Sequence, residues 1–229
     1  MMRHLQKLGK ALFLPVAILP ICGILMGLGY AMAPGAMGVP DAPTTGALYT
    51  IGFFLIKAGG ALIDNMALLF AVGVAVGLAN DNDGTAGLAG LVSWLMITNL
   101  LSTGVVSTIA PNMFEWADGA LANTANKVAF DKIENPLIGI LCGIIGATCY
   151  NKFKNTKLPD VLAFFGGKRS VAIVTGVVSI VVAAILLFVW PVVFGVLVAI
   201  GNGIKNMGVF GVGIYAFLNR LLIPTGLHH

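Results

Sequence analysis

Long apolar segments separated by short polar loops dominate this chain of 229 residues. Only 10% of the residues are charged, against about 25% in soluble domains. Crossing about 30 Å of hydrocarbon takes about 20 helical residues, and several segments reach that length. Backbone groups inside a bilayer must be hydrogen-bonded within the protein, which segments of this length achieve as helices. The sequence therefore predicts an all-α, polytopic integral membrane protein.

About six segments are predicted to span the membrane. They cover residues 11–32, 66–79, 87–107, 136–150, 171–200 and 209–223. Residues 51–65 contain Lys57, Asp64 and Asn65 and are predicted as an amphipathic segment that leads into the second span. Ionisable residues in such a place usually pair or line water, and a structural Lys57–Asp64 pair is the favoured interpretation.

The placement of basic residues predicts the orientation. Eight Lys and Arg residues lie before the first span or in the loop before the fifth, and three lie in loops on the opposite side. Because cytoplasmic loops carry an excess of Lys and Arg, the N-terminus is predicted to be cytoplasmic. The net charge of +4 does not indicate nucleic-acid binding, because the cations form short clusters between apolar runs.

Glycines recur four residues apart in three of the predicted spans. The pairs are Gly23 and Gly27, Gly73 and Gly77, and Gly139 and Gly143. This spacing places both glycines on one helix face and allows close approach of another backbone. The sequence leaves two interpretations open, namely packing within one subunit and a dimer interface.

We predict no metal site and no cofactor in this chain. Cys22, Cys142 and Cys149 all lie inside apolar runs without metal-ligand spacing, and they are interpreted as small apolar residues. The acidic loop 80–84 is short, and a polar turn on the inner side is favoured over a calcium site.

The first candidate binding site is the terminal run 219–229. Asn219 and Arg220 end an apolar segment, and a Pro-Gly break separates them from His228 and His229. Broken helices at membrane depth are where transporters bind substrates, and a guanidinium suits hydroxyl or phosphate oxygens. The alternative is an arginine that reaches the headgroups, followed by histidines from an expression tag.

The second candidate is the segment before the fifth span. Phe164, Phe165, Lys168 and Arg169 combine two aromatic rings with two cations. The simpler interpretation is a basic loop that sets topology, and the functional one is a docking surface for an acidic or phosphorylated cytoplasmic partner.

Five markers in order make the chain resemble a known family. They are residues 7–12 with 14–20, 59–71, 157–160, 164–169 and 219–229. These resemble the membrane (IIC) component of the bacterial sugar phosphotransferase system, glucose superfamily. The terminal Ile223-Pro224-Thr225-Gly226 is most similar to the N-acetylglucosamine branch.

The resemblance implies a homodimer that carries a sugar across the inner membrane and releases it as the 6-phosphate. Phosphate would come from a phosphocysteine on a IIB domain, supplied by IIA and the histidine carrier protein. Arg220 and His228 would contact sugar hydroxyls, which argues against the tag interpretation, and His229 and Asn219 would lie beside them. The reaction would belong to the assembled IIC/IIB system, with no catalytic residue in this chain.

The resemblance also implies a division of the chain. Residues 1–205 would be mostly dimerisation and scaffold helices, and 206–229 would begin the sugar-binding transport part. The family's later Gly-Ile-Thr-Glu-Pro motif and the IIB domain are not in this sequence, so we expect the chain alone to be inactive. The alternatives are a glucose-type permease, a non-catalytic membrane scaffold and, more weakly, an ion-coupled transporter using Asp64.

Overall fold

The computed structural model describes residues 2–40, 42–81, 83–110, 127–157, 159, 164–208, 211–213 and 216–217, and in these ranges it is helical, without strands. Its elements are α1 (Met2–Val16), α2 (Leu19–Met32), the 3₁₀ turn η1 (Pro34–Met37), α3 (Ala47–Asp64), α4 (Met66–Leu78), α5 (Gly84–Leu100), α6 (Thr103–Ile109), α9 (Pro136–Phe153) and α10 (Lys168–Asn206). The predicted all-α class is confirmed.

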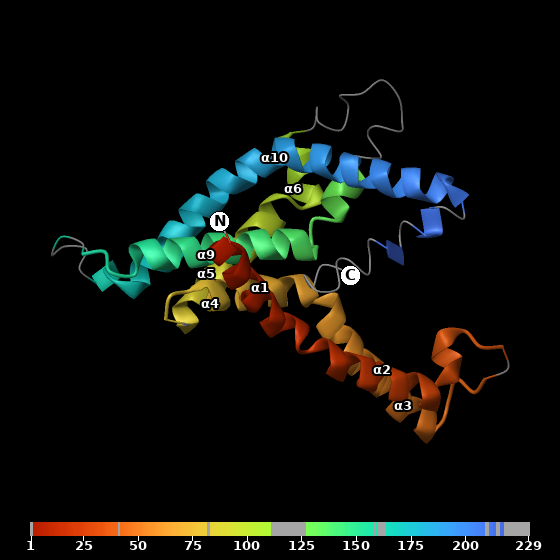
Figure 1. The fold of residues 1–229 in the computed structure, drawn as a ribbon. Helices are drawn as coiled ribbons and strands as arrows, with labels where there is room; N and C mark the ends of the chain where they lie inside the picture. Colours follow the sequence, from red (N-terminus) through yellow and green to blue (C-terminus); the bar gives the residue numbers. More distant parts are fainter. Residues whose placement is uncertain are drawn as a thin grey trace.

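Helices α4, α5 and α9 form the body of the protein, with α1 and α10 packed on its sides (Figure 1). Glycines let these helices meet backbone to backbone. A Cβ added to Gly146 of α9 would lie 2.5 Å from the amide nitrogen of Gly90 in α5 and 2.7 Å from its Cα. Gly139 of α9 abuts the carbonyl of Ala67 in α4 in the same way. The small residues therefore determine how closely the three helices pack.

Helices α2 and α3 form a hairpin that extends away from this body, with η1 near its tip (Figure 1). Its two helices also touch through glycines, since a Cβ on Gly29 would lie 2.7 Å from the carbonyl oxygen of Gly52. Ile24 and Leu28 on the outer side of α2 are exposed, as expected for a surface that faces lipid.

Helix α10 has 39 residues, which corresponds to about 58 Å. It bends near its middle (Figure 1), and Pro191, which removes a backbone hydrogen bond, lies inside it. Two buried hydrogen bonds fasten it to the rest of the protein. Ser179 Oγ donates to Ser93 Oγ of α5 at 3.0 Å, and Trp190 Nε1 donates to the Ala129 carbonyl at 2.7 Å.

Five of the six predicted spans fall within the described residues. Within the described ranges, four stretches are long and apolar enough to cross a bilayer: Gln6–Met32, Ala47–Asp64, Pro136–Phe153 and Lys168–Asn206. A fifth arises if α5 and α6 count as one span, although they are bent by 59°. The predictions for residues 136–150 and 171–200 are confirmed, whereas most of 209–223 lies outside the described residues.

The prediction that residues 51–65 only lead into a span at residues 66–79 is wrong. The part predicted as an approach segment, α3, is long enough to span, while α4 has only 13 residues. Asn65 separates them, because its side-chain amide donates to the Ala61 carbonyl at 2.8 Å and competes with helix continuation. Lys57 lies 5.3 Å from the Phe53 ring centroid and does not pair with Asp64. Residues seven apart on a helix are about 10 Å apart along its axis, which explains the missing contact.

Two of the three glycine pairs pack within the chain. Gly73 and Gly77 of α4 face Pro15 and Ala11 of α1, and the Gly139 and Gly143 pair of α9 faces α4. A Cβ added to Gly23 or Gly27 would meet no atom of another part of the described chain within 4 Å. The first two pairs therefore favour the intrasubunit interpretation.

Candidate functional site

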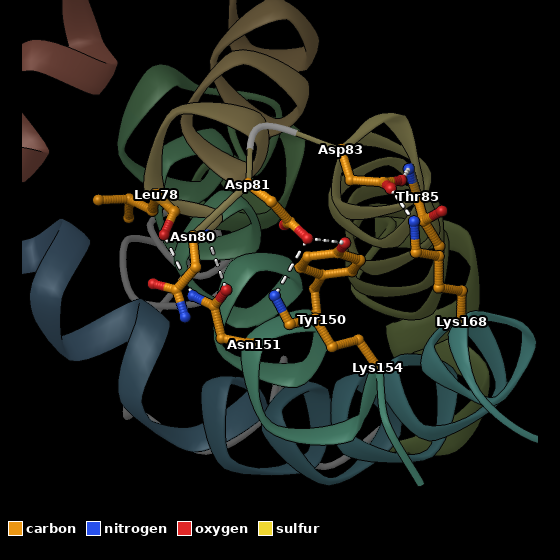
Figure 2. Close-up of polar contacts among 9 residues, drawn as sticks. All are labelled: Leu78, Asn80, Asp81, Asp83, Thr85, Tyr150, Asn151, Lys154 and Lys168. Carbon is orange, nitrogen blue, oxygen red and sulfur yellow. Dashed lines mark hydrogen bonds and ion pairs between the residues drawn. The ribbon is translucent and has the colours of Figure 1, made fainter.

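A polar network lies at one end of the body, where the α4–α5 turn contacts the end of α9 and the start of α10. Asp81 Oδ2 accepts hydrogen bonds from the Tyr150 hydroxyl at 3.0 Å and from Lys154 Nζ at 3.1 Å (Figure 2). Tyr150 and Lys154 can share this carboxylate because Lys154, the residue that caps α9, follows Tyr150 by four positions and therefore lies on the same side of the helix. The Lys154 ammonium also lies 5.2 Å from the Tyr150 ring centroid.

Asp83 ties the starts of two helices together. It caps α5 by accepting a hydrogen bond from the Thr85 amide at 2.8 Å, and it forms an ion pair with Lys168, the first residue of α10. Figure 2 shows Asp83, Thr85 and Lys168 on one side of Asp81. Both carboxylates of the loop thus serve as structural acceptors in a turn.

Asn151 fastens the end of α4 on the other side of Asp81 (Figure 2). Its Oδ1 accepts from the Asn80 amide at 2.9 Å, and its Nδ2 donates to the Leu78 carbonyl at 3.1 Å. Asn151 therefore satisfies backbone groups that the end of α4 would otherwise leave without partners.

Ion pairing lowers the pKa of both aspartates. The hydrogen bond from Lys154 keeps the pKa of Asp81 below its usual value, and the one from Lys168 does the same for Asp83. A carboxyl group with a lowered folded pKa stabilises the fold above its unfolded pKa, about 3.9, and that contribution is lost as the pH falls.

We therefore expect the thermal midpoint of the detergent-solubilised chain to fall as the pH drops below about 4. The double variant Asp81→Asn, Asp83→Asn should show a shallower fall over the same range, because two of the titrating groups are gone. Differential scanning fluorimetry at pH 7, 4 and 3 measures both proteins. Equal slopes for the two would contradict a role for this network in acid stability.

The four predicted docking residues lie together beside this network. The Arg169 guanidinium carbon is 4.6 Å from the Phe164 ring centroid, and Nη1 donates to the Phe164 carbonyl at 3.1 Å. The Phe165 ring meets Phe164 edge-on, with centroids 5.3 Å apart. Phe164 is 69% exposed and Phe165 44%. We call Phe164, Phe165 and Arg169 the aromatic–arginine surface, since Lys168 is engaged by Asp83.

The predicted sugar-binding residues Asn219, Arg220, His228 and His229 lie outside the described residues. The sequence interpretation missed the partners of the acidic loop. The Asp81 contacts join residues 69 and 73 positions apart, which no local pattern reveals. The only available signal was the spacing of Tyr150 and Lys154 on one helix face.

Comparison with known proteins gives a consistent match over the chain. The family model described as "Phosphotransferase system, EIIC" matches residues 9–229. The chain is 36% identical over its full length to the N-acetylglucosamine-specific EIICB component of Bacillus subtilis (strain 168), of which it covers 42%. It is 40% identical, over 97% of its length, to the N-acetylglucosamine-specific EIICBA component of Escherichia coli (strain K12), of which it covers 28%.

A glucose-specific relative is similarly close. The glucose-specific EIICBA component of Staphylococcus carnosus (strain TM300) is 38% identical over 99% of this chain, which covers 33% of that protein. The chain thus spans less than half the length of these relatives.

Proposed function

Because this chain belongs to the phosphotransferase-system EIIC family, we propose that it forms part of a permease that takes up a sugar through the bacterial cell membrane and releases it as the 6-phosphate. The match over residues 9–229 carries the proposal, and the apolar helices support a membrane location. Two N-acetylglucosamine-specific relatives support N-acetylglucosamine as the substrate, with glucose as the second candidate.

We assign two roles along the chain. Residues 1–205 form the scaffold and the surface through which two copies pair, and residues 206–229 begin the sugar-binding part. There Arg220 donates to sugar hydroxyls, and His228 donates or accepts beside it. Asn219 and His229 complete the polar lining.

The phosphoryl group comes from a partner in this proposal. The relatives are named EIICB and EIICBA components. These names support a IIB domain, with its phosphocysteine, as the donor of the phosphoryl group, and IIA as the protein that phosphorylates IIB. The sugar's 6-hydroxyl oxygen attacks phosphorus, the bond from phosphorus to the cysteine sulfur breaks, and the hydroxyl proton is released. In this proposal, residues 1–229 position the sugar.

A chimera tests the function. In the Escherichia coli relative, the segment matching this chain is replaced by residues 1–229, and the chimera is expressed in cells that lack their own N-acetylglucosamine and glucose uptake. We expect these cells to accumulate labelled N-acetylglucosamine 6-phosphate in preference to glucose 6-phosphate. Expression of residues 1–229 alone should give no phosphorylated product. A chimera that reaches the membrane but transports neither sugar would overturn the proposal and favour a scaffold.

The aromatic–arginine surface is proposed as the place where IIB docks. Exposed aromatic rings and an arginine are the residues that contribute most at protein interfaces. The double variant Phe164→Ala, Phe165→Ala should therefore weaken binding of a purified phosphorylated IIB domain about tenfold, measured with the chain in nanodiscs. Phe54→Ala is the matched control, because that ring is also exposed but lies on the α2–α3 hairpin. Equal binding by all three proteins would place the docking surface elsewhere.

A further inference from the structure

The end of the body that holds the polar network also contains a pocket of about 620 Å³. It lies between the first turns of α1, the end of α4 and the last turns of α9. This volume is in the range of pockets that hold small molecules. Its lining combines two cations, Lys7 and Lys152, with amides such as that of Asn80 and with apolar groups such as Leu8 and Ile144.

The pocket carries two positive charges, of which the Lys152 ammonium also lies 5.8 Å from the Phe153 ring centroid. None of its lining residues is acidic. In the part of the chain that the structure describes, neither Lys7 nor Lys152 forms a salt bridge, and the nearby Asp81 and Asp83 pair with Lys154 and Lys168 instead. Asn151 uses its side chain on the Leu78 carbonyl and the Asn80 backbone amide, and the side-chain amide of Asn80 faces the pocket as a donor for a ligand. The pocket therefore presents ammonium and amide donors to an anion.

The pocket also continues onto a surface suited to lipid. Thr148 and Ile144 line it, and they lie on one face of α9 with Lys152 at one end and the half-exposed Leu137 at the other. These residues are spaced by four or seven positions, so their side chains form one stripe along the helix. Since α9 is long and apolar enough to span, this stripe descends from the polar end toward the hydrocarbon.

We propose that this pocket binds the phosphate headgroup of an anionic phospholipid, with an acyl chain along the Thr148–Leu137 face of α9. Basic pockets between membrane helices are where anionic lipid headgroups bind. Lys7 and Lys152 contact the phosphate from two different helices, and Asn80 contacts the glycerol part. The lipid thereby joins the start of α1 to the end of α9, in the cytoplasmic leaflet for the predicted orientation. The inference goes beyond sugar transport and does not depend on it.

Native mass spectrometry of the whole chain tests this proposal. The protein is released from nanodiscs of phosphatidylcholine containing either phosphatidylglycerol or phosphatidylethanolamine. We expect retained phosphatidylglycerol on the unaltered chain and about 25-fold less on the double variant Lys7→Gln, Lys152→Gln, because each cation that contacts the headgroup adds about fivefold to the affinity for anionic lipid. The control is Lys10→Gln, Lys157→Gln, which removes the same charge from exposed lysines outside the pocket.

A second variant tests the site without removing a cation. Asn80→Asp keeps the side-chain size but places a carboxylate in a lining without acids, and it should reduce phosphatidylglycerol retention several-fold. Millimolar inorganic phosphate should not displace the lipid, because it lacks the acyl chain. Equal loss in both lysine pairs would show bulk surface attraction only and overturn the proposal. Equal retention of phosphatidylethanolamine, or displacement by free phosphate, would also overturn it.

Discussion

Replacing Gly146 with valine should leave little correctly folded protein. The α5 and α9 backbones meet at this residue, where a Cβ would lie 2.5 Å from the Gly90 nitrogen and 2.7 Å from its Cα. The nearest atoms belong to a backbone, so no flexible side chain can move aside. Overpacking commonly costs 1–3 kcal/mol, and a clash between two backbones should cost about 3 kcal/mol or more.

Size-exclusion chromatography and the thermal midpoint of the detergent-solubilised protein measure this effect. Gly176→Val is the matched control, because Gly176 lies on α10 and no atom lies within 4 Å of an added Cβ there. The control should remain monodisperse with a midpoint close to that of the unaltered chain. If Gly146→Val behaved like this control, the close packing of α5 on α9 would be wrong.

Replacing Arg220 with alanine should reduce sugar uptake by the chimera about 10- to 100-fold. Hydrogen bonds to a charged group contribute about 1.5–3 kcal/mol, which converts to this range. Arg220→Lys should retain part of the uptake, because lysine keeps the charge but loses the planar array of donors. Uptake of labelled N-acetylglucosamine, normalised to the amount of chimera in the membrane, gives the result.

Lys205→Ala provides the comparison for Arg220. Lys205 is an exposed cation in the last turn of α10 and has no proposed role in sugar binding. Its removal should leave uptake close to that of the unaltered chimera. If Arg220→Ala and Lys205→Ala had equal effects, Arg220 would contribute only charge to the membrane surface, and the assignment of the sugar site would fail.

The sequence predicted the features that depend on local composition. The lengths of the apolar runs were sufficient to identify α9 and α10, and the glycine spacing identified a closely packed face in two of three cases. Helix interruptions were harder, because they depend on single side-chain contacts. Asn65 ends α3 by bonding the Ala61 carbonyl, and Ser102 binds the Asn99 carbonyl at 2.8 Å where α5 gives way to α6.

The candidate site was predictable only in part. Phe164, Phe165 and Arg169 are neighbours in the sequence, so their association could be expected from it. Lys168 belonged to the same segment, but its partner Asp83 lies 85 residues earlier, and only the folded chain brings them together. The pocket at Lys7 and Lys152 is similarly invisible in the sequence, because it forms where three separate helices meet.

Because α10 is long, a small rotation near its middle moves its far end by a larger distance. Hydrogen bonds to Ser93 and Ala129 hold the helix at Ser179 and Trp190, while the residues after Pro191 extend for about 22 Å to Asn206. A rotation of 10° at the proline would displace the far end by about 4 Å, more than the length of a hydrogen bond. Small movements at this pivot would therefore be amplified at the start of the segment that leads to Arg220.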